Sequence, residues 1–154
     1  MTTAIASHSE RLQYETAAPE VFAAMRALEA QVRRSGLEGS LLELIKIRAS
    51  QINGCAFCLD MHTREARAAG ESDRRMHLVS VWREAALFTE REKAALAWTE
   101  AVTLVASSHV SDDVYEFAIS QFSAAELAKL TLAVIAINGW NRLAVSFRKS
   151  LPTE

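Results

Sequence analysis

Two cysteines and a histidine lie close together near the middle of the chain, in the segment from Cys55 to His62, which reads CAFCLDMH. No other cysteine occurs in the 154 residues. Two thiols separated by two residues can form a disulfide, and a nearby imidazole can take the proton that a thiol loses when it becomes a nucleophile. This segment therefore predicts a thiol redox site.

The spacing of these side chains suits a reaction with peroxide. If a helix begins near Cys55, both thiols lie in its first turn, where unpaired backbone amides and the helix dipole stabilise a thiolate. Residues three apart on a helix have Cβ atoms ~5–6 Å apart, which permits a disulfide. His62 follows Cys58 by four residues, on the same face, and can act as the base. A thiolate can then attack a peroxide to give a sulfenic acid, and the second thiol can condense with that acid.

Two other interpretations of the cysteine pair stay open at this point. Cys55, Cys58, His62 and one carboxylate form a ligand set that is typical of zinc, so the chain could be a zinc-binding structural protein. The cysteines could also be buried apolar side chains in a non-enzymatic subunit that binds a small ligand or a partner protein.

Composition limits the class of protein. The length suits one domain, residues 1–154, and the net charge of −2 does not indicate a surface that binds nucleic acid. The N-terminus has no basic segment followed by an apolar one, and the longest apolar run, Leu132 to Ile137, is far shorter than the ~20 residues that cross a bilayer. We expect a cytoplasmic protein that contacts neither membrane nor nucleic acid, where an isolated C-x-x-C is more often redox-active or metal-binding than structural.

The elements that position these residues are all predicted to be helices. Pro19 and Pro152 are the only prolines, glycine is scarce, and no segment alternates with a period of two. We expect an all-α bundle of about six to seven helices behind an N-terminal arm, residues 1–18. Capping residues and glycines place the helices at residues 19–36, 40–53, 55–69, 72–82, 89–106, from 111 onward, and 123–147.

Two features of these helices bear on function. Ser40 and Glu43 fit the S-x-x-E capping box, which explains Glu43 without any catalytic role. The last helix is apolar nearly all round from Leu130 to Trp140, so we expect it to be buried partly by its own chain and partly between subunits. The protein is therefore predicted to be a homo-oligomer.

The sequence also resembles a known family. Glu43, eleven residues, the pair Cys55-x-x-Cys58, three residues and then His62 are similar to the signature of the alkylhydroperoxidase D family, within the carboxymuconolactone decarboxylase superfamily. The resemblance extends to residues 82–84, 89–92 and 138–142.

This resemblance implies an antioxidant peroxidase that needs no metal or organic cofactor and is reduced by a thiol or dithiol electron donor protein. By resemblance, Cys58 attacks the peroxide, Cys55 is the proton donor and resolving thiol, and His62 and Glu43 form a proton relay. It also implies a trimer or hexamer. The best-studied peroxidase members carry a histidine between the two cysteines, where this chain has Ala56 and Phe57, and the decarboxylase members lack the cysteine pair.

Overall fold

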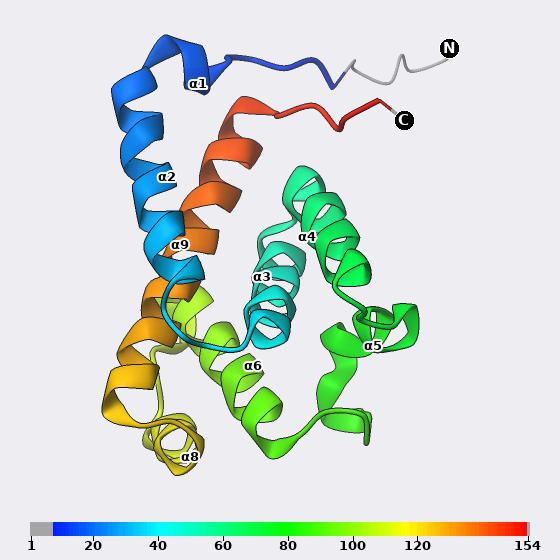
Figure 1. Ribbon diagram of the computed structural model, residues 1–154, viewed down its shortest axis with the longest axis vertical. Coiled ribbons are helices and arrows are strands. Elements are labelled where there is room, and N and C mark those ends of the chain that lie inside the picture. The colour runs from blue at the N-terminus through cyan, green and yellow to red at the C-terminus, as the bar shows by residue number, and fades with distance from the viewer. Residues whose placement is uncertain (1–7, 154) are drawn as a thin grey trace.

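The computed structural model describes residues 8–153, and within that range every regular element is helical (Figure 1). The elements, in chain order, are α1 (Tyr14–Ala17), α2 (Pro19–Arg33), α3 (Gly39–Asn53), α4 (Ala56–Ala68), α5 (Asp73–Leu78), the 3₁₀ helix η1 (Val79–Glu84), α6 (Glu90–Thr103), α7 (Val105–Ser108), α8 (Asp112–Gln121) and α9 (Ala124–Phe147). The predicted all-α class is confirmed. The predicted count of six to seven is too low for this part of the chain, because α1 and α7 are single turns that the sequence pattern did not reveal.

Most helices begin where the sequence predicts. Pro19 occupies the first turn of α2, where a missing N–H costs nothing. The side chains of Ser72 and Ser111 accept hydrogen bonds from the third residue of their helices, as predicted for N-caps. Thr89 and Ser123 each form a complete capping box, in which the helix's third residue is Glu92 and Glu126, respectively.

The capping box predicted for Ser40 and Glu43 is wrong. The N-cap of α3 is Glu38, two residues before Ser40, and its side chain makes no cap. The Glu38 carboxylate instead binds Arg91 on α6, with 2.7 Å between the arginine Nε and Oε1. Ser40 is therefore already inside the helix, and Glu43 is free to bind another residue.

The helix predicted from Ser72 to Trp82 also breaks. α5 ends at Leu78 and the chain continues as the 3₁₀ helix η1, with a kink at Val81 (φ −123°, ψ 29°). Valine is a weak helix former, and here the buried indole of Trp82 donates a hydrogen bond to Glu100 Oε1 at 2.9 Å. This tertiary contact outweighs the local preference for one continuous helix.

Helix α9 is the central element of the bundle. It lies between α2 and α3 in Figure 1 and also packs against α6. Leu130, Val134 and Ile137 are fully buried, whereas Leu132 and Ile135 of the same helix are exposed. By length and composition alone α9 would suffice to cross a membrane, a test that the core helix of a globular protein also passes. The prediction that its own chain covers α9 only in part is confirmed.

The described part of the N-terminal arm packs onto the end of α9. Residues 1–7 of the predicted arm lie outside the described range. The ring of Tyr14 is buried against Phe22 and Phe147, and the backbone N–H of Arg11 donates to the carbonyl of Phe147 at 2.9 Å. The arm thus reaches the same end of the bundle as the N-terminus of α4 (Figure 1).

Candidate active site

The two cysteines lie at the turn that joins α3 to α4. Gly54 takes a left-handed conformation (φ 65°, ψ 34°), which ends α3 and which a side chain would disfavour. Cys55 is the N-cap of α4, and its sulfur accepts a hydrogen bond from the backbone N–H of Cys58 at 3.2 Å. Both side chains are buried and are joined in a disulfide, with 5.4 Å between the Cα atoms. The predicted helix start at Cys55 is correct to within one residue.

A cluster of amides fixes this turn to α9. The side-chain nitrogen of Asn53 donates to Asn138 Oδ1 and to Asn141 Oδ1, both at 2.9 Å. Asn141 is fully buried and donates to Ser50 Oγ at 3.0 Å. Buried amides keep such positions only when their hydrogen bonds are satisfied, so this cluster specifies where α3 ends relative to α9. The cysteines follow directly after it.

His62 is held by a carboxylate from α3. His62 is 3% exposed, and its Nδ1 lies 3.0 Å from Glu43 Oε2. This hydrogen bond sets the tautomer and the orientation of the ring. The residue that the sequence assigned to a capping box is therefore the partner of the predicted base.

Glu65 is a second carboxylate at this histidine, and sequence analysis missed it. Its Oε2 lies 3.4 Å from His62 Nδ1, and its side chain is 41% exposed, against 17% for Glu43. Burial lowers the pKa of His62, but the hydrogen bonds to Glu43 and Glu65 outweigh it and hold this pKa above its usual value of 6.5. The hydrogen bond to His62 in turn lowers the pKa of Glu65. The spacing of three residues on one helix was a signal that could have identified Glu65.

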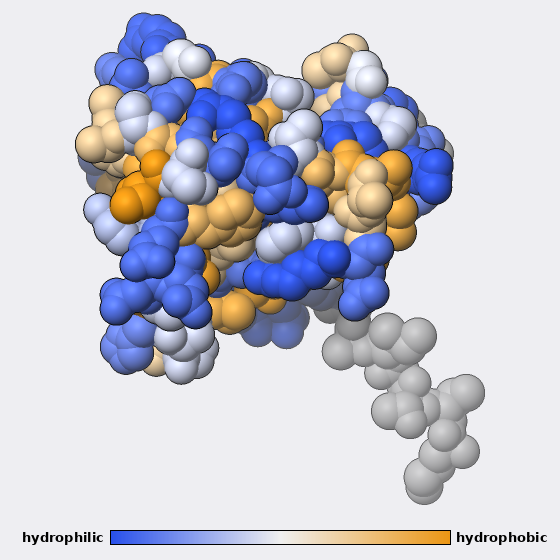
Figure 2. Space-filling view, turned by 90° about the horizontal axis from the view of Figure 1, so that it is seen from below, coloured by the Kyte–Doolittle hydropathy of each residue, from blue (hydrophilic) through white to orange (hydrophobic). Residues whose placement is uncertain are grey.

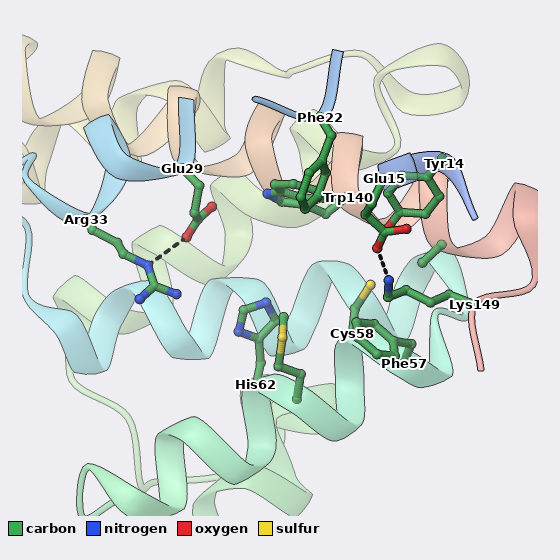
Figure 3. Close-up of a pocket in the computed structure, with 12 residues that line it drawn as sticks. Tyr14, Glu15, Phe22, Glu29, Arg33, Phe57, Cys58, His62, Trp140 and Lys149 are labelled. Carbon is green, nitrogen blue, oxygen red and sulfur yellow. Dashed lines mark hydrogen bonds and ion pairs between the residues drawn. The ribbon is translucent and has the colours of Figure 1, made fainter. Parts of the chain in front are cut away.

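A pocket of about 280 Å³ opens onto Cys58 and His62 (Figure 3). Phe22, Phe57 and Trp140 line its middle, so the space beside the sulfur is largely apolar. Charged pairs flank this apolar part in Figure 3: Arg33 with Glu29, and Lys149 with Glu15. Such a pocket suits a small ligand with an apolar body.

The structure brings the four predicted site residues together. Cys55 is bonded to Cys58, Cys58 and His62 line one pocket, and Glu43 binds His62. Their catalytic roles stay predictions. The chain has no third cysteine that could form a disulfide with either Cys55 or Cys58.

A metal could be held here by a different set of groups from the one predicted. Ligand atoms of Glu43, His62 and Glu65 all lie within 4.8 Å of one another. The two sulfurs, which the zinc interpretation requires as thiolates, are bonded to each other. The predicted set with Cys55 and Cys58 is therefore available only after reduction.

Three comparisons with known proteins bear on this site. The profile of the carboxymuconolactone decarboxylase family matches residues 19–101, which include all four predicted site residues. The uncharacterised protein YdfG of Bacillus subtilis strain 168 is 38% identical over 138 residues, which are 90% of this chain and 94% of YdfG.

Among solved structures, a protein of unknown function from Agrobacterium tumefaciens, described as a candidate antioxidant defence protein AhpD, is 49% identical. The match has a TM-score of 0.92 and covers 95% of this chain and 100% of that chain. The debrominase Bmp8 matches with a TM-score of 0.76 at 15% identity, over 88% of this chain and 73% of its own, which shows a shared fold alone.

Proposed function

Because the chain belongs to the carboxymuconolactone decarboxylase family, and within it is similar to AhpD proteins, we propose that it is a thiol-dependent peroxidase. Its substrates are hydrogen peroxide or organic hydroperoxides, and its cycle runs through the Cys55–Cys58 disulfide. The observation that carries this proposal is the disulfide itself, with one of its sulfurs facing an apolar pocket beside a histidine that a carboxylate orients.

In the reduced protein, the proposed cycle begins at Cys58. His62 takes the proton of the Cys58 thiol, and the thiolate attacks the terminal oxygen of the hydroperoxide. The O–O bond breaks, Cys58 becomes a sulfenic acid, and the alcohol leaves with a proton from Cys55 or His62. The sulfur of Cys55 then attacks the sulfenic sulfur to form the disulfide, and the sulfenic hydroxyl leaves as water with whichever of those two protons, on Cys55 or on His62, remains.

Glu43 supports this chemistry through His62. Its carboxylate keeps a proton on Nδ1, so that Nε2 is the basic nitrogen of the neutral ring, and it stabilises the imidazolium once the thiol proton has been taken. Glu65 adds to the same effect from a more exposed position. This chain has Phe57 directly before Cys58, so His62 carries the proton transfer without a second imidazole between the cysteines.

The apolar lining of the pocket favours organic hydroperoxides over hydrogen peroxide. Phe22, Phe57 and Trp140 offer apolar surface that an alkyl or aryl group can cover, whereas hydrogen peroxide gains nothing from it. We therefore expect a lower KM for cumene hydroperoxide than for hydrogen peroxide. We further propose that the chain forms a single domain, acts in the cytoplasm as a homo-oligomer, and receives electrons from a thiol or dithiol donor.

The proposal is tested by counting thiols before and after one equivalent of peroxide. The reduced protein should titrate as two thiols per chain and the treated protein as none, with no covalent dimer on a non-reducing gel. Cys58→Ser should abolish peroxide consumption. Thiols that persist under peroxide would favour the non-enzymatic binding subunit, and about one equivalent of zinc on the reduced sample would favour the zinc-binding protein.

A further inference from the structure

Cys55 lines a pocket that Cys58 does not line. A space of about 130 Å³ is lined by Cys55 but not by Cys58, whereas the 280 Å³ pocket is lined by Cys58 but not by Cys55. Phe57 and Lys149 line both pockets, with the ammonium of Lys149 5.0 Å from the centre of the Phe57 ring. Ala144 lines both pockets as well, so these three residues are shared by the two pockets, and each cysteine borders a different one.

The pocket at Cys55 is basic. Arg148 and Lys149 line it and, within residues 8–153, no acidic side chain does. Lys149 is paired with Glu15, which lines the other pocket. The guanidinium of Arg148 makes no ion pair with any described residue, so its charge is available to a molecule that enters. The Cys58 pocket, in contrast, combines its apolar middle with charged pairs that are already neutralised.

We propose that the reductant is an anionic dithiol that enters through the Cys55 pocket and attacks the sulfur of Cys55. This proposal deepens the proposed function, since it assigns the reductive half of the same cycle. Peroxide and reductant then use different entrances, and Arg148 selects for negative charge beside the incoming thiol.

The reaction balances as two displacements at sulfur. One thiolate of the reductant attacks Cys55, the Cys55–Cys58 bond breaks, and Cys58 leaves as a thiolate in the substrate pocket. The second thiol of the reductant, once deprotonated, attacks the reductant sulfur of the mixed disulfide. Cys55 leaves as a thiolate and takes up a proton, the reductant departs as its disulfide, and two electrons have passed to the protein.

In this proposal Cys58 is the leaving group, on the side of the disulfide where His62 can stabilise its thiolate. A thiol of low pKa leaves faster in such an exchange. His62 lies four residues after Cys58, on the same face of α4, and its hydrogen bonds to the carboxylates of Glu43 and Glu65 favour its charged form. Displacement at sulfur is close to linear, so a thiolate that comes from the Cys55 side expels Cys58 toward the pocket where the next peroxide binds.

The entrance can be tested without peroxide. Wild-type protein is oxidised with diamide, treated briefly with the anionic monothiol 2-mercaptoethanesulfonate, and quenched with N-ethylmaleimide. Fragmentation mass spectrometry then locates the mixed disulfide. We expect the sulfonate adduct on Cys55 and the maleimide on Cys58, whereas the adduct on Cys58 would overturn the proposal. If the protein is an active peroxidase but carries the adduct on Cys58, only the proposed entrance at Cys55 is refuted. If it carries the adduct on Cys55 but consumes no peroxide, only the proposed function is refuted.

The role of charge is tested by rate. Per thiolate, 2-mercaptoethanesulfonate should reduce the disulfide faster than cysteamine, which carries a positive charge. Arg148→Gln should lower the ratio of the 2-mercaptoethanesulfonate rate to the cysteamine rate about two- to fivefold, which is the effect of one surface charge pair. Arg74→Gln removes an exposed arginine on α5, far along the chain, and should leave the ratio unchanged. A ratio that Arg148→Gln does not change, or that both variants lower equally, would contradict the selection by Arg148.

Discussion

The carboxylate of Glu43 has one clear task at the scale of single residues. It accepts a hydrogen bond from His62 and takes no part in capping α3. Lys46 Nζ lies 3.9 Å from its other oxygen, but that buried ammonium is bound more closely by Glu29, at 2.6 Å. Removal of the Glu43 charge should therefore act mainly through the imidazole.

Glu43→Gln should lower the peroxidase rate far more than it lowers stability. Glutamine can still accept the hydrogen bond from Nδ1 but cannot stabilise an imidazolium by charge, and general acid–base help is worth ~10²–10⁴-fold. We expect a loss of at least about 10²-fold in kcat/KM and a change of about 1 kcal/mol in the free energy of unfolding. Peroxide consumption and urea denaturation measure the two effects.

Glu65→Gln is the matched control for that substitution. The same chemical change is made on the same imidazole nitrogen, but at 3.4 Å and on a side chain that is 41% exposed. The loss of rate should be several times smaller than for Glu43→Gln. Equal losses would make Glu65 as important as Glu43, and wild-type turnover of Glu43→Gln would remove Glu43 from the relay.

The raised pKa of His62 predicts a pH dependence of stability. A histidine whose pKa is higher in the folded than in the unfolded protein stabilises the fold fully below pH 6.5, and this contribution disappears as the pH rises through the folded-state pKa. The stability of the oxidised wild type relative to His62→Gln should therefore decline above pH 6.5. Urea denaturation of both proteins from pH 5.5 to 8.5 measures this, and a difference that grows with pH would have the wrong sign.

Sequence reasoning identified Cys55, Cys58, His62 and Glu43 because their spacing along α3 and α4 carries the information. It missed the pocket, because Phe22 and Trp140 come from α2 and α9, and only the packing of those helices brings them to Cys58. It also gave Glu43 two roles and could not decide between them. That choice depends on whether the N-cap of α3 is Ser40 or Glu38, two residues earlier, which no local pattern specifies.

At the scale of elements, the same four-residue motif has two outcomes. Ser123 and Glu126 form a complete capping box at α9, with 3.2 Å from the Glu126 N–H to Ser123 Oγ. Ser40 and Glu43 have the same types and spacing but form none. At α3 the N-cap is Glu38, so Ser40 lies inside the helix, and the Glu43 carboxylate binds His62 instead.

Two alanine substitutions should separate these outcomes. Ser123→Ala should lower the free energy of unfolding by about 1 kcal/mol, since it removes a cap from the central helix. Ser40→Ala should change it by less than ~0.5 kcal/mol, since the exposed hydroxyl caps nothing. Chemical denaturation of both variants measures the pair. An equal cost for the two substitutions would mean that Ser40 caps α3 after all.

The helix boundaries that could be predicted share a physical basis. Caps and glycines act within one turn of the backbone, so Pro19, Ser72, Thr89, Ser111 and Ser123 mark real starts. The errors occur where distant contacts decide. Trp82 reaches Glu100 and breaks a helix, and Tyr14 packs on Phe147 and orders a turn that its own sequence does not encode.

At the scale of the whole molecule, apolar side chains remain on the surface of α9 and its neighbours. Figure 2, which shows the end of the bundle near α8, has hydrophobic surface among the hydrophilic side chains. The exposed apolar residues of α7, α8 and α9 are Val105, Tyr115, Ile119, Leu132, Ile135 and Val145. Exposed apolar surface on a central helix favours contact with another subunit.

A charge on this surface should therefore dissociate the protein. We expect light scattering to give a mass well above 17.0 kDa for the wild type and a lower mass for Ile135→Lys, whose side chain is 53% exposed. Leu151→Lys is the matched control, because Leu151 is 54% exposed but lies in the C-terminal tail after α9. A wild-type mass near 17.0 kDa at micromolar concentration would contradict the expected oligomer.

The most direct test of the proposed function identifies the cysteine to which the peroxide transfers an oxygen atom. Cys55→Ser and Cys58→Ser are each treated with cumene hydroperoxide in the presence of dimedone, and the adduct is located by mass spectrometry. Cys55→Ser should carry dimedone on Cys58, because the sulfenic acid formed there has no thiol left to condense with it. Cys58→Ser should carry little or none. Equal labelling of the two variants, or labelling of Cys55 alone, would contradict the account.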